Sequence, residues 1–254
     1  MAIKAALKAG SIHKKYFGKV FKVQTKTTSF DLLTTADTEA EDAVVKLIRK
    51  IYPTHNILAE EKIYQQTNSD YTWIIDPLDG TNNFAQGLPV FCASVALAYK
   101  NKVIAGAVYD VSRNELFYAQ KNKGAFLNGK RIHVNKSATL KQAILITGFY
   151  YSRDKDMLDT LSAMKRFLRK HIIGIRRFGS AALDLCYVAS GRVAGFWEFT
   201  LSPWDFAAGS LIIQEAGGKV TDSRGAKAIP VKKSFIVASN AKIHSMMLEV
   251  INNK

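Results

Sequence analysis

The chain has 254 residues, 48% of them hydrophobic, and its 36 Lys and Arg against 21 Asp and Glu give a formal net charge of +15. This length and apolar content support a large core in one domain, with approximate lobes at 1–140 and 141–254. No apolar run is long enough for a membrane span or a signal peptide, so we expect a cytoplasmic protein with no membrane partner. The sequence also lacks internal repeats, low-complexity tracts and long Pro/Ser-rich linkers.

Two helices are predicted at the start of the chain, near 1–17 and 37–51. In the second, apolar residues recur at positions 40, 43, 44, 47, 48 and 51, the spacing of an amphipathic helix. Asp37 stands just ahead of this stretch, after Thr34-Thr35-Ala36. A role at the helix N-terminus explains Asp37, and a functional role stays open.

A short strand is predicted at 57–60, where the apolar run Ile57-Leu58-Ala59 leads into Glu60 and Glu61. Pairs of adjacent Glu residues are mostly solvated surface. This pair becomes a candidate functional site only because other acidic residues follow a neighbouring strand.

That neighbouring strand is predicted from the apolar run Trp73-Ile74-Ile75, and it leads into Asp76-Pro77-Leu78-Asp79-Gly80-Thr81-Asn82-Asn83-Phe84. Asp and Pro occupy the two opening positions where a type I turn favours them, so the turn would present Asp76 and Asp79 toward one side. The carboxylates would then emerge at the C-terminal end of a strand, where the ligands of α/β sheets collect.

The chemistry of this segment points to metal-dependent phosphate binding. Two carboxylates in one small space repel each other unless they are protonated or bound to a hard cation such as Mg²⁺. Gly80-Thr81-Asn82-Asn83 reads as a turn into a helix whose first N–H groups suit a phosphate. An ordinary capping turn is the alternative, and the preceding buried strand argues against it.

The remaining elements divide the chain into two kinds of structure. Strands are predicted at 91–99, 102–110, 114–120 and 125–132, which read as an antiparallel meander. The second half alternates in the manner of α/β proteins, with strands at 143–147, 193–198 and 234–238 and helices near 155–170, 180–190, 204–216 and at the C-terminus. Asp205, in Pro203-Trp204-Asp205, begins one of these helices and is a further candidate metal ligand.

The histidines and cysteines argue against zinc and thiol chemistry. None of the five histidines lies in the acidic motifs or at a zinc-binding spacing, so oxygen ligands favour Mg²⁺ or Mn²⁺. Cys92 and Cys186 lie in apolar runs without a CxxC partner, and we expect them to pack as small hydrophobic side chains.

These motifs together resemble the inositol monophosphatase family, whose members are lithium-sensitive, magnesium-dependent phosphatases. The resemblance covers nearly the whole chain, and its most specific part is the segment from Trp73 to Phe84. Four further segments carry it: Ala59-Glu60-Glu61, where the family usually has Gly-Glu-Glu; Lys123-Gly124-Ala125-Phe126-Leu127-Asn128-Gly129; the stretch from Gly179 to Gly191; and Trp204-Asp205-Phe206-Ala207-Ala208-Gly209 with Gln214-Glu215-Ala216-Gly217-Gly218. The resemblance implies a layered αβαβα sandwich, a metal site between its halves, and a homodimer.

The resemblance also implies roles for individual residues. Glu60, Asp76, the Leu78 carbonyl and Thr81 would surround a first Mg²⁺, and Asp76, Asp79 and Asp205 a second, with Mn²⁺ as a possible substitute and Li⁺ as an inhibitor. Asp37 would support a looser third metal or pair with Thr81 to orient the attacking water, so Thr81, Asp37 and Glu60 form the implied catalytic set. The implied substrate contacts are Asp79, Gly80, Thr81, Ala181, Glu198 and Asp205, with the N–H groups of Gly80 and Thr81 on the phosphate and Glu198 on a substrate hydroxyl.

Departures from the family pattern leave the substrate open. Ser202-Pro203 stands where animal enzymes commonly have His-Cys, and the segment 147–152 places two tyrosines where relatives frame the leaving group. Inositol monophosphate or a related small sugar phosphate is the expected substrate, since Asn82-Asn83-Phe84 is closer to inositol monophosphatases than to the nucleotide phosphatases. Fructose 1,6-bisphosphate, histidinol phosphate, NADP and a nucleotide 3′-phosphate remain alternatives.

The charge of +15 is the feature that catalysis explains least. Basic clusters occur at 14–15, 165–166, 169–171, 176–177 and 232–233. Steering of anionic substrates, binding to RNA or a transcription complex, and a solvated surface all fit these clusters. We favour the solvated surface, because the clusters are dispersed and lack an aromatic-interleaved RNA-binding motif. A regulatory RNA-binding protein is therefore the alternative to a phosphatase.

Overall fold

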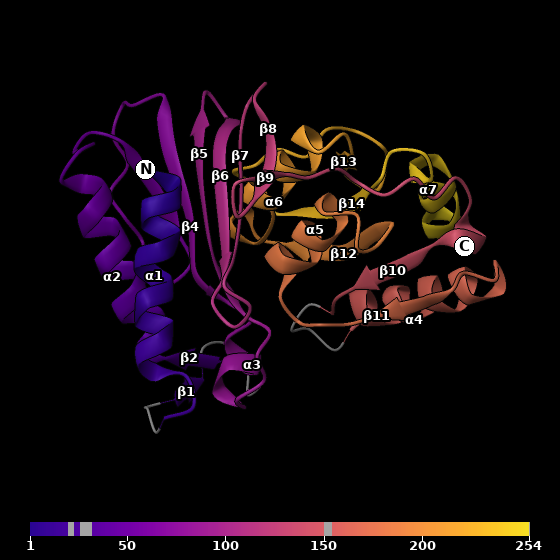
Figure 1. Ribbon diagram of the computed structural model, residues 1–254, viewed down its shortest axis with the longest axis horizontal. Helices are drawn as coiled ribbons and strands as arrows, with labels where there is room; N and C mark the ends of the chain where they lie inside the picture. The colour runs from indigo at the N-terminus through magenta and orange to yellow at the C-terminus, as the bar shows by residue number, and fades with distance from the viewer. Residues whose placement is uncertain (20–22, 26–31, 150–153, 254) are drawn as a thin grey trace.

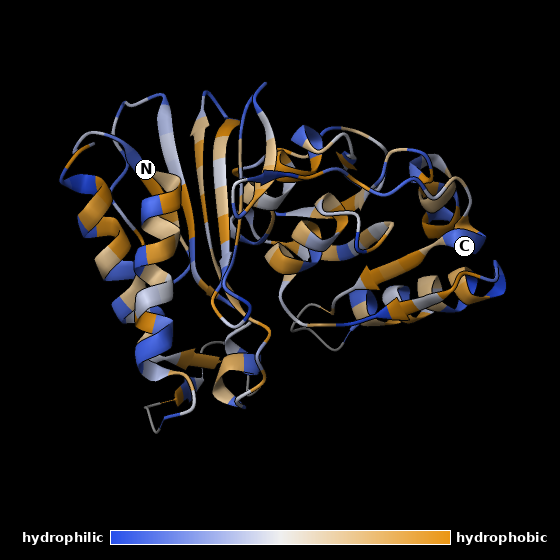
Figure 2. Cartoon of the chain, viewed as in Figure 1, coloured by the Kyte–Doolittle hydropathy of each residue, from blue (hydrophilic) through white to orange (hydrophobic). Residues whose placement is uncertain are grey.

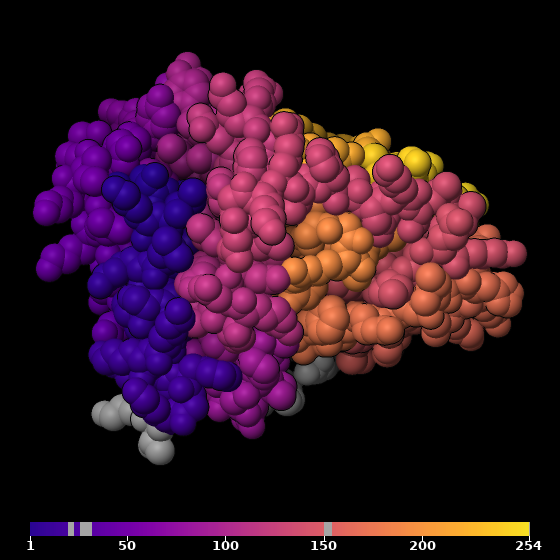
Figure 3. Space-filling view, in the orientation of Figure 1, coloured from indigo at the N-terminus to yellow at the C-terminus, as the bar shows by residue number. Residues whose placement is uncertain are grey.

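A computed structural model describes residues 1–19, 23–25, 32–149 and 154–253, which form five alternating layers of helices and sheets (Figure 1). A pair of helices, a seven-stranded sheet, a second pair of helices, a five-stranded sheet and a third pair of helices follow one another across the molecule. This is the αβαβα sandwich that the sequence predicts. On the face shown in Figure 3, the N-terminal and C-terminal halves meet without a gap.

The seven-stranded sheet has the order β3-β4-β5-β6-β7-β8-β9. Its strands are β3 (Asn56–Ala59), β4 (Tyr71–Asp79), β5 (Cys92–Tyr99), β6 (Lys102–Asp110), β7 (Glu115–Gln120), β8 (Gly124–Leu127) and β9 (Lys130–Arg131). Only β3 pairs in parallel, with β4, and the remaining pairs are antiparallel. The expected meander is therefore confirmed, except that the strand predicted at 125–132 is two strands. Asn128 and Gly129 separate these two strands, and both have a positive φ, as in a tight hairpin turn.

Helices α1 (Ala2–Tyr16) and α2 (Thr35–Arg49) cover the outer face of this sheet (Figure 1). Along both helices hydrophobic and hydrophilic residues alternate in blocks (Figure 2), as expected when one face is buried. Their small and branched side chains, such as Ala5, Ala9 and Val44, pack against Trp73 and Ile75 of β4. Burial of this face stabilises both helices and holds the start of α2 near the end of β4.

The five-stranded sheet has the order β11-β10-β12-β14-β13. Its strands are β10 (Ile144–Thr147), β11 (Gly174–Arg176), β12 (Gly195–Leu201), β13 (Lys219–Thr221) and β14 (Ser234–Ser239). β10 pairs in parallel with both neighbours, whereas β14 is antiparallel to β12 and β13. The sequence did not predict β11 and β13, which are three residues each and too short to show a period.

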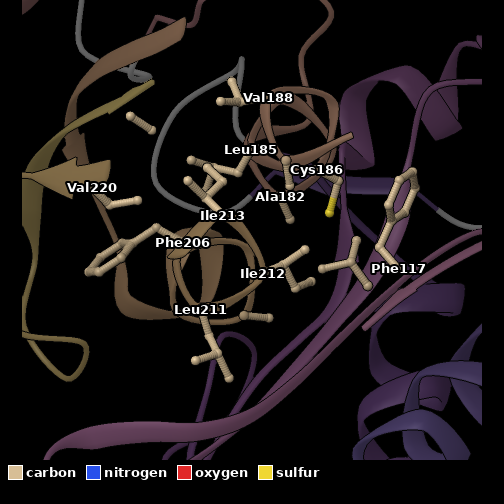
Figure 4. Close-up of a cluster of buried hydrophobic side chains, with 14 of the residues drawn as sticks. Phe117, Ala182, Leu185, Cys186, Val188, Phe206, Leu211, Ile212, Ile213 and Val220 are labelled. Carbon is tan, nitrogen blue, oxygen red and sulfur yellow. The ribbon is translucent and has the colours of Figure 1, made fainter. Parts of the chain in front are cut away.

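Helices α5 (Ala181–Ala189) and α6 (Pro203–Glu215) form the middle layer between the sheets. Figure 4 shows Leu185, Cys186, Phe206 and Ile212 in the apolar cluster between them. A Cβ at Gly106 would lie 3.0 Å from the Cα of Ala208, so β6 and α6 approach closely through small residues. Cys92 and Cys186 are buried free cysteines, as the sequence predicts.

The outermost layer consists of α4 (Lys155–Arg169) and α7 (His244–Asn252), packed on the five-stranded sheet. Arg166 of α4 donates hydrogen bonds to the carbonyls of Val250 (from Nε, 2.7 Å) and Ile251 (from Nη2, 3.0 Å) at the end of α7. Arg166 therefore joins two helices, whereas Lys165, Arg169 and Lys170 beside it are exposed.

Shorter elements complete the described chain. They are β1 (Val23–Thr25) paired with β2 (Leu32–Thr34), the helix α3 (Thr81–Ala85) and the 3₁₀ turn η1 (Leu140–Gln142). Within the described residues, no helix is both long enough and apolar enough to cross a membrane.

His244 provides a test of this packing by pH. It is buried, its Nδ1 lies 2.9 Å from Ser239 Oγ, its Nε2 lies 2.9 Å from Thr221 Oγ1, and burial lowers its pKa to about 4. His244 binds a proton near pH 6.5 in the unfolded chain but only near pH 4 in the folded chain. The contribution of neutral, buried His244 to the free energy of unfolding is therefore fully present above pH 6.5 and is lost as the pH falls toward 4. The loss is roughly 3 kcal/mol. In urea denaturation from pH 7 to 4, His244→Asn should show a shallower decline than the wild type, whereas the exposed control His133→Asn should not.

Candidate active site

A cavity of about 280 Å³ opens where the end of β4 meets β12 and the first turns of α3, α5 and α6. Nearly all of the site residues predicted from the sequence line it: Glu60, Asp76, Leu78, Asp79, Gly80, Thr81, Ala181, Glu198 and Asp205. Asp37 is the exception and reaches the cavity only through Thr81. Glu61 does not line the cavity, and its N–H donates to the Glu41 carboxylate at 2.8 Å instead.

The acidic segment after Ile75 is the end of β4 rather than a turn that follows the strand. β4 runs through Asp79, and its register with β5 shifts between Asp76 and Asp79. This irregularity replaces the type I turn expected from the sequence, because pairing with β5 continues on both sides of it. The Leu78 N–H donates to Asp76 Oδ1 at 3.0 Å, and the Pro77 carbonyl lies 2.8 Å from the Nε2 of buried His13.

Gly80 connects β4 to α3 in a conformation that needs glycine. Its φ is +92°, and a Cβ there would lie 2.8 Å from the carbonyl oxygen of Val90. A residue with a side chain would therefore be strained in this backbone conformation, and its Cβ would also collide with the segment that leads into β5. Gly80 and the next residue, Thr81, both line the cavity.

Asp79 is held by the first turn of α5. Its Oδ2 accepts hydrogen bonds from Ser180 Oγ at 2.6 Å and from the Ala182 N–H at 2.8 Å. Burial raises the pKa of Asp79 to about 6, although the hydrogen bonds from Ser180 and Ala182 act to lower it. The nearby charge of Glu60 raises the pKa further. A buried carboxylate beside a second one favours a proton or a cation in the cavity.

Asp205 is held by the first turn of α6. It is the N3 residue of a capping box, and its Oδ2 accepts from the Ser202 N–H at 2.7 Å. Burial raises the pKa of Asp205, and the charges of Glu60 and Asp79 raise it further. The same helix start therefore both uses Asp205 as a cap and directs it into the cavity.

Asp37 both caps α2 and accepts a hydrogen bond from Thr81. It is the N3 residue of the capping box of α2, where Oδ2 accepts from the Thr34 N–H at 2.7 Å. Its Oδ1 accepts from Thr81 Oγ at 2.8 Å, and the Thr81 hydroxyl also lies 2.9 Å from the Leu78 carbonyl. Burial raises the pKa of Asp37 to about 6, partly offset by the hydrogen bonds from Thr34 and Thr81.

Glu198 lies on β12, just before a register shift in its pairing with β14. It is buried, and burial raises its pKa to about 8, although Arg177 acts in the opposite direction. A Cβ at Gly148 would collide with the Glu198 carboxylate, so Gly148 leaves the space that this side chain occupies.

Among the residues that line the cavity are four polar or charged ones to which sequence reasoning gave no site role and which bear on its chemistry. Arg177 and Lys233 line it, although the sequence assigned their clusters to the solvated surface. Ser180, which orients Asp79, and Asp184 also line it. The position of Ser180 and Asp184 inside the motif from Gly179 to Gly191 was the available signal. The expected tyrosines at 150 and 151 lie outside the described residues.

The donor set suits a hard cation by its chemistry. Every candidate ligand offers oxygen, and none offers sulfur or imidazole nitrogen. Within the described chain, no three His, Cys, Asp or Glu side chains form a ready-made ligand cluster. Asp79 and Asp205 are instead held by donors from the helix starts, while still lining one cavity.

The oxygen ligands of the acidic cavity suit the metal chemistry of a phosphatase, and sequence comparison supports this class of protein. The inositol monophosphatase family model matches residues 1–254, and the chain belongs to this family. The Nus factor SuhB of Pseudomonas aeruginosa is 42% identical over 257 residues, covering 99% of this chain and 94% of the relative. The fructose-1,6-bisphosphatase/inositol-1-monophosphatase of Thermotoga maritima is 41% identical over 251 residues, with the same two coverages.

Solved structures agree with the fold. The extragenic suppressor protein suhB from Bartonella henselae superimposes with a TM-score of 0.92 at 36% identity, covering 99% of this chain and 96% of that one. An IMPase/NADP phosphatase complexed with Mg²⁺ and phosphate matches at a TM-score of 0.82 and 27% identity, covering 92% of this chain and 87% of that one. Structures in this family thus include complexes with a divalent cation, in keeping with a metal-dependent enzyme.

The crowding of carboxylates predicts a stabilising substitution. With EDTA present, Asp205→Asn should melt a few degrees above the wild type, because the amide keeps an oxygen for the Ser202 N–H but carries no charge. A gain of about 1 kcal/mol corresponds to roughly 2–4 °C for a chain of this size. The control is Asp222→Asn in the turn at 222–226, which should not raise the melting temperature. A lower melting temperature for Asp205→Asn would show that the charge is not destabilising.

Proposed function

We propose that this protein is a Mg²⁺-dependent phosphomonoesterase that hydrolyses inositol monophosphate or a related small sugar phosphate. The observation that carries the proposal is the convergence of Glu60, Asp76, Asp79 and Asp205, from three separate segments, on one cavity. A protein that only bound a partner would gain no stability from so many clustered carboxylates. Family membership supports the same reading.

The ligand assignment follows the positions of these oxygens. Glu60, Asp76, the Leu78 carbonyl and Thr81 would hold one Mg²⁺, and Asp76, Asp79 and Asp205 a second. Bound divalent cations supply positive charge that activates water and stabilises the phosphoryl oxygens and the leaving alkoxide. Mn²⁺ shares the preference for oxygen ligands. Inhibition by Li⁺ is proposed by analogy with a staphylococcal inositol monophosphatase solved as a LiCl-soaked inhibitory complex.

Thr81 and Asp37 would orient the attacking water. The Thr81 hydroxyl donates to Asp37 Oδ1 at 2.8 Å, which leaves the lone pairs of its oxygen to accept a hydrogen bond from water. Asp37 is fixed in turn by Thr34 and by the start of α2. The pair therefore holds a proton acceptor in one orientation, next to Glu60.

The substrate would lie across the cavity from its metal end to its sugar end. Gly80 and Thr81 would bind the phosphate through their N–H groups, and Ala181 and Glu198 would contact the leaving group. With a pKa of about 8, Glu198 would be largely protonated at neutral pH and could donate to a hydroxyl oxygen as well as accept. A second phosphate, as in fructose 1,6-bisphosphate or NADP, is an alternative that Arg177 and Lys233 would favour.

Metal removal and one substitution test the proposal. In a phosphate-release screen over inositol, sugar and nucleotide phosphates, activity should require Mg²⁺ or Mn²⁺ and disappear with a chelator. Asp76→Asn should lower turnover on the order of a thousandfold or more, because the amide offers no charge to two metals. Its fold is checked by circular dichroism. Full activity of the wild type after exhaustive metal removal, or of Asp76→Asn with metal, would contradict the assignment.

A second candidate function is association with RNA or a transcription complex. Relatives 41–42% identical carry the name Nus factor SuhB, and α4 exposes Lys165, Arg169 and Lys170 on one side of the molecule. Three exposed leucines of the same helix, Leu158, Leu161 and Leu168, form an apolar stripe that would suit a homodimer, the assembly that the family resemblance implies. We favour catalysis, since the acidic cavity has no use in a purely regulatory protein.

A charge reversal on α4 separates the two functions. Lys165, Arg169 and Lys170 are changed together to Glu, while Arg166 is kept because it joins α4 to α7. We expect a modest fall in kcat/KM at low salt, an unchanged kcat, and no tight binding to an RNA oligomer. Light scattering of the variant checks its oligomeric state. Submicromolar RNA affinity of the wild type at physiological salt, abolished by this change, would favour the regulatory function.

A further inference from the structure

A second cavity, of about 200 Å³, lies toward the end of α6, whereas the acidic cavity lies at its start. Asp205 in the first turn of α6 lines the acidic cavity, and Leu211 and Gln214 near the last turn line the second one. The two cavities have no lining residue in common. The proposed phosphatase chemistry therefore makes no use of the second cavity, although its volume approaches the 280 Å³ of the first.

Three lysines from separate parts of the chain surround the second cavity. They are Lys102 at the start of β6, Lys121 directly after β7, and Lys227 in the segment between β13 and β14. All three are exposed, and within the described chain no acid forms an ion pair with any of them. Their ammonium groups are therefore available to a ligand that enters the cavity.

The nearby acid and the end of α6 do not account for these lysines. Glu215 is the one acid among the described residues of the lining, and its two carboxylate oxygens accept the N–H groups of Asn122 and Gly124 at 2.8 Å each. The end of a helix also attracts cations through its free carbonyls. Here the Ile213 carbonyl already accepts the Gly218 N–H at 2.9 Å, so the backbone caps this end without a lysine.

Hydrogen-bonded turns fix the backbone next to each lysine. Asn101, directly before the first lysine, has a φ of +58° in the turn between β5 and β6. The Lys121 N–H donates to the Ile104 carbonyl at 3.0 Å. Ala226, directly before the third lysine, accepts the N–H of Asp222 at 2.8 Å. The positions from which the three cations extend are thus set by the fold.

The rest of the lining offers an apolar surface. Val103 and Ala228 are partly exposed and pack against the apolar cluster between the sheets. The buried side chains of Phe206, Leu211 and Val220, labelled in Figure 4, complete the apolar part of the lining. Ligand sites commonly combine such a surface with a few charged groups that fix the orientation of the ligand.

We propose that this cavity is a second ligand site, which binds a small phosphate ester through the three lysines and packs its carbon body on the apolar surface. Three lysines and one glutamate leave the lining with an excess of two positive charges. A phosphate ester carries close to two negative charges at neutral pH, and lysine binds phosphate as a point charge. No residue of the acidic cavity takes part, so the inference does not depend on the proposed phosphatase function.

Methyl NMR tests the site directly. The probe is phenylphosphonate at pH 8, where it is a dianion with an apolar ring and no ester bond to hydrolyse. Titrated into the protein in EDTA, it should shift the methyl signals of Val103 and Leu211, and not those of Leu201 in the acidic cavity. Inorganic phosphate lacks the carbon body and benzyl alcohol lacks the charge, so both should bind about tenfold more weakly or worse.

Two triple variants with the same change in net charge separate a built site from general attraction. Replacing the three lysines of the cavity by Ser should raise the Kd of phenylphosphonate about tenfold or more, the equivalent of one charge-assisted hydrogen bond. The control replaces three exposed lysines outside the lining by Ser, namely Lys123, Lys130 and Lys219, and should keep the wild-type Kd. Both variants should melt near the wild type, since surface substitutions change stability little.

The same titrations contain the results that would overturn the inference. Shifts at Leu201 without shifts at Val103 and Leu211 would place the probe in the acidic cavity. Equal weakening in both triple variants would show attraction by net charge alone, and equal affinity for inorganic phosphate would show that the apolar surface binds nothing. Tighter binding of phthalate, a dicarboxylate of similar size, would reject a phosphate ester as the ligand.

Discussion

The structure depends on bringing several carboxylates into one poorly solvated cavity, where they repel one another and resist ionisation. Two of the acids that line the cavity, and Asp37 behind it, are held by donors at the start of a helix: Asp37 by the N-cap Thr34 of α2, Asp79 by the N-cap Ser180 and by Ala182 of α5, and Asp205 by the N-cap Ser202 of α6. Helix starts suit this purpose because their first N–H groups have no partners within the helix. The same contacts that cap the starts of these helices therefore position the three acids.

The layered sandwich brings these helix starts together. Apolar packing of α5 and α6 between the sheets sets where both helices begin, and the close contact of Gly106 with Ala208 sets how near α6 lies to β6. α2 is held on the opposite face of the seven-stranded sheet, and its Asp37 reaches the cavity through Thr81 at the end of β4. Packing far from the cavity thus controls the separation of its oxygens, since a tightly packed core transmits small displacements.

The charge of the whole chain is opposite in sign to that of its cavity. The chain carries +15 overall, yet its buried cavity is lined by six acids and two cations, listed as Glu60, Asp76, Asp79, Asp184, Glu198 and Asp205 with Arg177 and Lys233. A basic exterior raises the local concentration of anions over long range, whereas the acids act at contact distance and favour cations and hydroxyls. A positive surface and an acidic cavity are therefore compatible in one phosphatase.

The sequence alone determined most of the helices and strands and many of the residues that line the cavity, because hydrophobic periodicity and the acidic motifs are local signals. Asp76, Asp79 and Asp205 were identified from their neighbours along the chain, as were both lobes' main helices. The tertiary structure decided what depends on distant partners: the irregular end of β4, which only pairing with β5 produces; the double role of Asp37, which needs Thr81; and the entry of Arg177, Lys233 and Asp184 into the cavity. Which face of an element a charged side chain occupies is set by packing against other elements, and no local pattern records it.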